Sequence, residues 1–261
     1  MKTVLFTGGR SGIAYHVIQK LIKKNYFIYI TAHTEQQVQS LQKIYQDFSN
    51  IECFKLDVTK KNDREKLENL DIDILVCNAA IGVGGSISEL PISKLRKNFE
   101  VNVFSNFEIV QIVLKKMMEK ESGKIVMMAS LAGLLPIPFL GSYCASKASI
   151  IKLTETLRQE LKIASSKVQI ILVEPGLYHT GFNQVMLENK YDWMKDNTYF
   201  KKELDMIKNC ENFVFGALES HNFNSIATPI VRAITRKKSP FLVRAPFYQV
   251  FGVKLYLLFK A

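Results

Sequence analysis

A tyrosine and a lysine four residues apart, Tyr143 and Lys147, are the residues of this chain best suited to proton transfer. Residues at this spacing share one face of a helix, so a phenol and an ammonium group can meet there. The ammonium is expected to lower the pKa of Tyr143 from about 10 towards neutrality. Such a tyrosine can give or take a proton at a substrate oxygen. The alternative is a packed tyrosine one turn from a surface lysine, and the pattern alone leaves both open.

The amino-terminal segment has the pattern of a strand, a glycine-rich turn and a helix. Residues 3–7 form a short apolar, β-branched run, and helically spaced apolar positions follow from residue 12. Gly8 permits a tight turn, Gly12 lets the backbone approach a pyrophosphate, and Ala14 fills the third small position. The free N–H groups of the helix N-terminus favour an anion. The segment therefore predicts a dinucleotide site, with a plain strand-to-helix turn as the alternative.

Strand-like apolar runs alternate with helical patterns along the rest of the chain. Strands are predicted at 3–7, 26–31, 51–55, 73–77, 124–129 and 168–173, with a candidate seventh at 241–243. Helices are predicted near 12–24, 35–48, 62–68, 92–119 and 143–165. This alternation predicts an α/β fold, a single Rossmann-like doubly wound parallel sheet with helices on both faces. Ligands of such sheets gather at the carboxyl ends of the strands.

Composition limits the class of protein. A chain of 261 residues fits one α/β domain. The net charge of +11 is scattered and no nucleic-acid-binding motif is visible, so no nucleic-acid partner is expected. The four cysteines form no Cys-x-x-Cys pair, which predicts neither a metal site nor a disulfide framework and favours the cytoplasm. No signal peptide is predicted, and no apolar stretch approaches the roughly 20 residues of a membrane span.

Five motifs occur in a fixed order. They are Thr7–Ile13, the segment Cys77-Asn78-Ala79-Ala80, Ser130 thirteen residues before Tyr143, the Tyr143/Lys147 pair, and Pro175-Gly176 followed by Thr180. Together they resemble the short-chain dehydrogenase/reductase family, closely over about residues 1–185 and loosely beyond. The resemblance implies an oxidoreductase that transfers hydride between a nicotinamide cofactor and a secondary alcohol or ketone.

The resemblance also implies a role for each catalytic residue. Tyr143 is the general acid/base, and Lys147 lowers its pKa and binds the nicotinamide ribose. Ser130 holds the substrate oxygen, and Asn102 holds a water beside Lys147. A hydroxyl donor and a proton source would stabilise the charge that hydride transfer leaves on oxygen. The alternatives are that Ser130 ends a strand and that Asn102 is a buried structural hydrogen-bonder.

Cofactor contacts are implied in the same way. Asp57 contacts the adenine amino group with Val58 beside it, although Asp57 could instead cap a helix. Thr180 bonds the carboxamide next to Pro175 and Gly176, and Tyr178 stands where the family often has Val or Ile. The remaining implied contacts are Gly8, Arg10, Ser11, Gly12, Ile13, Asn78, Ala79, Tyr143 and Lys147.

The end of the second strand bears on the choice of cofactor. Ala32 stands where NAD-preferring relatives usually carry Asp, so no carboxylate is expected for the ribose 2′-hydroxyl. His33 stands where NADP-preferring relatives usually carry Arg, and Arg10 could also reach a 2′-phosphate. NADP(H) is therefore favoured and NAD(H) is possible. An exposed loop histidine is the alternative for His33.

The single domain, 1–261, divides into a cofactor-binding and catalytic core (1–180), a substrate lid (181–225) and a C-terminal helix or tail (226–261). Bulky apolar and Met-rich residues in the lid suit a steroid-, retinoid- or acyl-like substrate, unless they are ordinary packing. The tail mixes basic residues, from Arg236 to Lys260, with aromatic ones. It could make a peripheral membrane contact. Packing or a subunit contact is favoured, and a homodimer or homotetramer is expected.

Two other functions remain open. A non-catalytic NADP(H)-binding regulator or scaffold would share the cofactor motifs, although an intact set of Asn102, Ser130, Tyr143 and Lys147 argues against it. A nucleotide-sugar epimerase or dehydratase would share the Tyr/Lys pair. Those chains are usually longer, with a differently spaced glycine turn.

Overall fold

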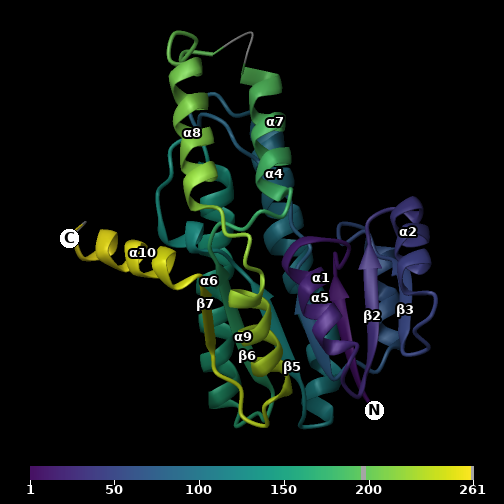
Figure 1. Cartoon of the computed structure of the whole chain (residues 1–261). Helices are drawn as coiled ribbons and strands as arrows, with labels where there is room; N and C mark the ends of the chain where they lie inside the picture. Colours follow the sequence, from purple (N-terminus) through teal and green to yellow (C-terminus); the bar gives the residue numbers. More distant parts are fainter. Residues whose placement is uncertain (195–197, 260–261) are drawn as a thin grey trace.

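Seven strands form one parallel sheet in the order β3-β2-β1-β4-β5-β6-β7 (Figure 1). The computed structural model describes residues 1–194 and 198–259, so the last two residues of the predicted tail, Lys260 and Ala261, lie outside it. The strands are β1 (Lys2–Thr7), β2 (Tyr26–Ala32), β3 (Ile51–Lys55), β4 (Ile74–Cys77), β5 (Lys124–Met128), β6 (Gln169–Pro175) and β7 (Leu242–Ala245). The predicted Rossmann-like fold is confirmed, and the candidate seventh strand is β7.

Helices cover both faces of this sheet. Side chains of a strand alternate between its faces, so a strand of consecutive apolar residues needs a covering layer on each side. Val4 and Phe6 of β1 pack with α1, α2 and α9, whereas Leu5 packs with α5 and α6. The helices of the core are α1 (Gly12–Leu21), α2 (Glu35–Tyr45), α3 (Lys61–Glu65), α4 (Ile92–Phe99), α5 (Ser105–Glu119), α6 (Gly141–Ile163) and α9 (Asn224–Thr235).

One predicted helix contains an irregular turn. The pattern over 92–119 predicts a single helix, but residues Glu100–Phe104 form a π-helical turn between α4 and α5. A π turn adds about one residue per turn and is frequent at functional sites. Asn102 lies at its centre.

Three further helices stand outside the sheet layers. The helices α7 (Phe182–Met194) and α8 (Leu204–Leu218) rise side by side above the carboxyl edge of the sheet (Figure 1). The last helix, α10 (Phe247–Phe259), extends to one side from the end of β7. No helix in the described part of the chain is both long enough and apolar enough to cross a membrane.

The basic and aromatic parts of the tail lie at opposite ends of the strands, the basic part at their amino ends and the aromatic part at their carboxyl ends. The carbonyls of Arg236 and Lys237 accept hydrogen bonds from Lys124 and Gln169, the first residues of β5 and β6. The strand β7 then carries the chain across the sheet, and α10 begins at the carboxyl edge. A membrane contact through the aromatic residues of α10 would therefore not include Arg236, Lys237 and Lys238.

Candidate active site

Tyr143 and Lys147 lie one turn apart near the start of α6. The Lys147 Nζ atom is 5.7 Å from the centroid of the Tyr143 ring and donates a hydrogen bond of 2.9 Å to the Met128 carbonyl at the end of β5. Lys147 is buried and Tyr143 is partly buried. The two side chains share one face of the helix, as their spacing predicts.

Burial is the main cause of the pKa shifts of both Tyr143 and Lys147. It raises the pKa of Tyr143 to about 12, although the nearby Ser130 hydroxyl lowers it in part. It also lowers the pKa of Lys147 to about 8. The expected lowering of the Tyr143 pKa is therefore wrong for the chain by itself, because burial destabilises the phenolate more than its neighbours stabilise it. Tyr143 holds its proton at neutral pH.

Ser130 connects three segments of the site. It follows β5, and its hydroxyl donates to the Pro175 carbonyl at 3.3 Å and accepts from the Ala132 amide at 3.1 Å. The same hydroxyl lies close enough to Tyr143 to lower its pKa. Ser130 thus faces both the predicted proton donor and the end of β6.

Asn102 is fully buried and bonded to protein on every side. Its Oδ1 atom accepts from the Ile81 amide at 2.9 Å, and its Nδ2 atom donates to the Ile81 carbonyl, Asn98 Oδ1 and Ser146 Oγ. Its carbonyl accepts from Asn106. The side chain therefore has the structural role that the sequence left open, and its part in holding a water stays a prediction.

Asn98 and Asn106 extend this polar network and are missed by the sequence interpretation. Asn98 donates to both the carbonyl and the hydroxyl of Ser142, the residue before Tyr143. Asn106 donates to the Ala79 carbonyl. The signal was present, because three asparagines four residues apart fall on one helix face.

The glycine turn between β1 and α1 is tight and is held by hydrogen bonds from the loop after β4. Gly8 and Gly12 adopt φ of +66° and +63°, where a side chain is disfavoured. Asn78 donates to the Gly8 carbonyl at 2.7 Å, and the Ala79 amide donates to the Thr7 hydroxyl at 3.0 Å. Arg10 and Ser11 are exposed and Ile13 is half-buried. The Ser11 side chain makes no capping bond, so the first N–H groups of α1 have no side-chain cap from it.

His33 has a carboxylate neighbour that its own strand does not supply. Asp57 follows β3, the strand beside β2, and its Oδ1 atom lies 3.6 Å from His33 Nδ1. The same oxygen accepts from the amide and hydroxyl of Thr59, so Asp57 also orders its own turn, whereas Val58 is buried beside it. The sequence of β2 does not indicate this carboxylate, which comes close to His33 because adjacent parallel strands end at the same edge.

The segment after β6 is attached on both sides. The Gly176 amide donates to the Ala245 carbonyl, and a Cβ on Gly12 would lie 3.1 Å from the Thr180 side chain, which brings Thr180 to the glycine turn. Tyr178 is buried in the core and bonds Ser225, so it does not belong to the site. His179, half-exposed, pairs with Glu219 at 2.8 Å.

Apolar side chains cover Tyr143. The Phe182 ring at the start of α7 lies 5.6 Å from the Tyr143 ring, centroid to centroid. Leu140, Cys144 and Met186 form a buried cluster beside them, which Ile137 and Ala132 complete. Met186 packs closely on Gly82, so α7 also rests on the loop after β4.

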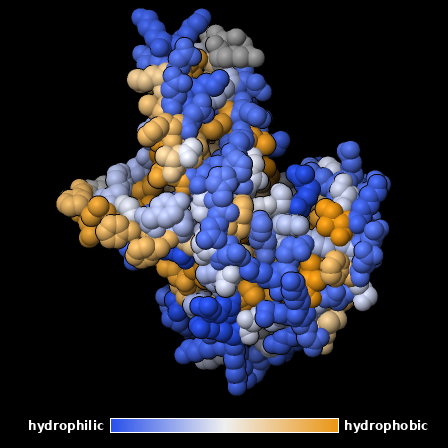
Figure 2. Space-filling model, viewed as in Figure 1, coloured by the Kyte–Doolittle hydropathy of each residue, from blue (hydrophilic) through white to orange (hydrophobic). Residues whose placement is uncertain are grey.

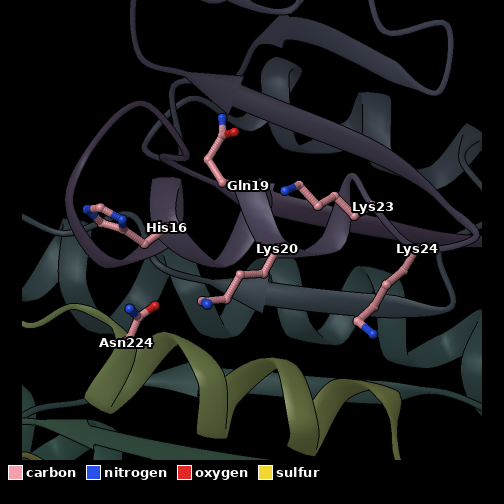
Figure 3. Close-up of a pocket in the computed structure, with 6 residues that line it drawn as sticks. All are labelled: His16, Gln19, Lys20, Lys23, Lys24 and Asn224. Atoms are coloured by element: carbon pink, nitrogen blue, oxygen red, sulfur yellow. The ribbon is translucent and has the colours of Figure 1, made fainter.

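A separate surface pocket of about 490 Å³ lies between α1 and α9 (Figure 3). Lys20 of α1 and Asn224 of α9 lie across from each other there. Its other lining residues are His16, Gln19, Lys23 and Lys24. None of them belongs to the predicted site.

Residues 2–190 match the family model described as short chain dehydrogenase. The chain belongs to the short-chain dehydrogenase family. It is 32% identical over 201 residues to a probable short-chain type dehydrogenase/reductase, VdlC, of Helicobacter pylori, a match that covers 75% of this chain and 71% of that protein. The family is one of oxidoreductases, which confirms the resemblance drawn from the motifs.

Solved structures share the fold at low identity. A short-chain dehydrogenase/reductase from Burkholderia phymatum in complex with NAD is 22% identical, with a TM-score of 0.81 and coverage of 97% of this chain and 92% of that one. The closed form of a serine dehydrogenase complexed with NADP+ is 21% identical, with a TM-score of 0.78 and coverage of 95% and 96%. Both likenesses show the fold alone.

Proposed function

We propose that this protein is an NAD(P)(H)-dependent oxidoreductase that interconverts a secondary alcohol and a ketone, with Tyr143 as its general acid/base. The observation that carries the proposal is the meeting of Tyr143, Ser130 and Lys147 where β5 and β6 end. Parallel sheets bind their ligands at this edge. Membership of an oxidoreductase family supports the same reaction type.

The residues present fit a nicotinamide dinucleotide. The glycines of the first turn leave room for a pyrophosphate, and the uncapped N-terminus of α1 offers N–H donors and a partial positive charge. Asn78 and Ala79 hold that turn, and Thr180 lies against Gly12. When bound, the cofactor would supply the hydride.

Proton transfer falls to this chain's own residues. In reduction, Tyr143 donates its phenolic proton to the substrate oxygen, and a raised pKa keeps that proton available at neutral pH. Ser130 donates a hydrogen bond to the same oxygen. In oxidation Tyr143 must first lose its proton, and the Lys147 ammonium favours the phenolate. Burial lowers the pKa of Lys147 to about 8, so the ammonium persists up to that pH.

NADP(H) is the preferred cofactor in this proposal. Arg10 is exposed beside the glycine turn, and His33 is 67% exposed at the end of β2, so both can approach a 2′-phosphate. Asp57 opposes the preference, because its carboxylate lies next to His33 and would repel a phosphate. The preference is accordingly small, and NAD(H) remains a usable cofactor.

The substrate is lipophilic, of a steroid-, retinoid- or acyl-like kind. The side chains around Tyr143 are apolar, with Phe182 and Met186 above it and Leu140 beside it. Residues 181–225 act as the substrate lid of a single domain whose residues 1–180 bind the cofactor. Apolar walls with few polar groups are typical of sites for apolar ligands.

Turnover of a panel of lipophilic ketones with NADPH and with NADH tests the proposal. Steady-state reduction with either cofactor, faster with NADPH and dependent on Tyr143, is the expected result. Titration of the same protein with each cofactor accompanies the assay. Tight cofactor binding without turnover of any ketone or alcohol would favour the non-catalytic regulator, and binding of neither cofactor would contradict the proposal.

A further inference from the structure

The helix α10 is apolar and has no partner among the described residues that buries it. None of its residues from Phe247 to Phe259 is buried, and Leu258 and Phe259 are 75% and 81% exposed. Lys254 is the one charged residue between positions 247 and 259. Figure 2 shows the result as an orange projection at the left of the molecule. An apolar helix exposed in this way requires a covering surface.

The apolar residues of α10 point to all of its sides. Residues 255–258, Leu-Tyr-Leu-Leu, occupy four consecutive positions, which take just over one complete helical turn, and all four are exposed. A protein partner typically covers one stripe of a helix. It would leave the other side of α10 in water. Lipid can surround the helix on every side that does not face the protein.

The length and composition of α10 suit one leaflet of a bilayer. Thirteen residues make a helix of about 20 Å, whereas a span needs about 20 residues. Five of the thirteen are aromatic, namely Phe247, Tyr248, Phe251, Tyr256 and Phe259. Tyrosine is enriched where a bilayer meets water, and phenylalanine occurs on the apolar faces of interfacial helices.

The apolar surface continues from α10 onto α8. Phe213, Val214 and Leu218 are exposed on α8, and Tyr248 donates a hydrogen bond of 2.8 Å to the Leu218 carbonyl. Gln249 accepts from the Leu177 amide at 2.7 Å and donates to the Leu218 carbonyl. The first turn of α10 is thus hydrogen-bonded both to the end of α8 and to the segment that follows Gly176.

We propose that α10 and the exposed apolar residues of α8 form a docking surface for a lipid bilayer, with α10 lying in the interface of one leaflet. The surface would bring the carboxyl edge of the sheet next to lipid. Docking does not depend on the proposed function. The consequence that a lipophilic substrate arrives from the bilayer rests on it.

Flotation of the purified full chain with vesicles tests the docking. One set of vesicles contains phosphatidylcholine alone and the other a mixture with phosphatidylglycerol. The test variant is Phe251→Glu with Leu258→Glu, and the matched control is Ile163→Glu, which changes an 85% exposed residue at the last position of α6. All three positions are exposed, so the variants are expected to melt like the wild type.

The wild type and Ile163→Glu are expected to float with both kinds of vesicle, and the double variant is expected to lose at least about tenfold in bound fraction. Phosphatidylglycerol should strengthen binding by no more than a few-fold, because α10 carries a single lysine. Equal flotation of the double variant, or no flotation of the wild type, would overturn the proposal. A different outcome is a wild type that forms a dimer and does not bind vesicles, with a double variant that is monomeric. That result would show that a second copy of the chain covers α10. Flotation needs no turnover, so its outcome is separate from that of the proposed function.

Discussion

Two regions next to Tyr143 are stabilised by different forces: the asparagine network between the loop after β4 and α6, referred to as below Tyr143, and the apolar cover from α7, referred to as above it. Below, Asn98, Asn102 and Asn106 bind the backbone of the loop after β4 and the first turns of α6 through short, directed hydrogen bonds. Above, Phe182 and Met186 contribute apolar packing, which has no fixed direction. Removal of one member of a buried polar network lowers the free energy of unfolding, because its partners lose their hydrogen bonds. An apolar cover can repack after a substitution.

This difference assigns the two regions different tasks. The polar network fixes where Tyr143 and Lys147 stand, and a reaction centre requires that precision. The apolar cover sets which substrates come close and can vary in shape. Substitutions in the two regions should therefore affect different kinetic constants, kcat below Tyr143 and KM above it.

Lys147→Met is expected to have the largest effect among the substitutions that leave Tyr143 in place. Oxidation requires the phenolate, which the ammonium favours, so its kcat should fall about a hundredfold or more, and reduction should fall less. The measurement is kcat in both directions for this variant and for Lys152→Met, an exposed lysine of the same helix. Equal rates in the two variants would contradict the role of Lys147.

Asn98→Leu should lower both stability and kcat. It leaves Asn102 Nδ2 and the Ser142 hydroxyl short of a partner in a buried site, at a cost of about 1–3 kcal/mol of unfolding free energy. Because Asn98 positions the turn before Tyr143, kcat should fall about tenfold with little change in KM. Denaturant unfolding and steady-state kinetics measure the two effects, and a loss of stability alone would reduce Asn98 to a structural residue.

Phe182→Ala should act on KM. Its ring covers Tyr143, so KM for a lipophilic ketone is expected to rise about tenfold, in keeping with the loss of one apolar contact of about 1–3 kcal/mol. Val185→Ala is the control, since Val185 is exposed on the same helix. Two results would contradict the assignment of this region to substrate binding. One is an equal change of KM in both variants, and the other is a fall of kcat in Phe182→Ala with an unchanged KM.

His33→Ala should have the smallest effect. The affinity for NADPH is expected to fall a few-fold and the affinity for NADH to stay unchanged, because an exposed histidine adds only a weak charge contact. Asp57→Asn should shift the preference the other way, towards NADPH, because it removes the negative charge while its amide oxygen can still accept from Thr59. Fluorescence titration with both cofactors measures this, and unchanged NADPH affinity would remove His33 from the cofactor site.

Regular features of this fold could be predicted from the sequence. The apolar residues 4–6 of β1 and 74–77 of β4 are continuous runs typical of buried strands, and the positive φ of Gly8 and Gly12 follows from the turn that a phosphate site needs. The shared face of Tyr143 and Lys147 follows from helical periodicity. Each of these depends on residues close together in the chain.

Features that depend on tertiary neighbours could not be predicted in this way. The approach of Asp57 to His33 follows from the pairing of β2 with β3. The separation of Arg236 from α10 follows from β7, the edge strand that runs alongside β6 between them. The π turn at Asn102 leaves the apolar pattern of the helix unbroken. The raised pKa of Tyr143 comes from burial, which the Tyr/Lys spacing does not report.

Turnover by Tyr143→Phe tests the central claim most directly. The substitution removes one hydroxyl and keeps the ring that packs on Phe182, so cofactor affinity and melting temperature should equal those of the wild type. The account predicts that kcat falls by about a hundred- to ten-thousand-fold in both directions. Turnover within a few-fold of the wild type, with cofactor still bound, would show that another group transfers the proton and would contradict the account.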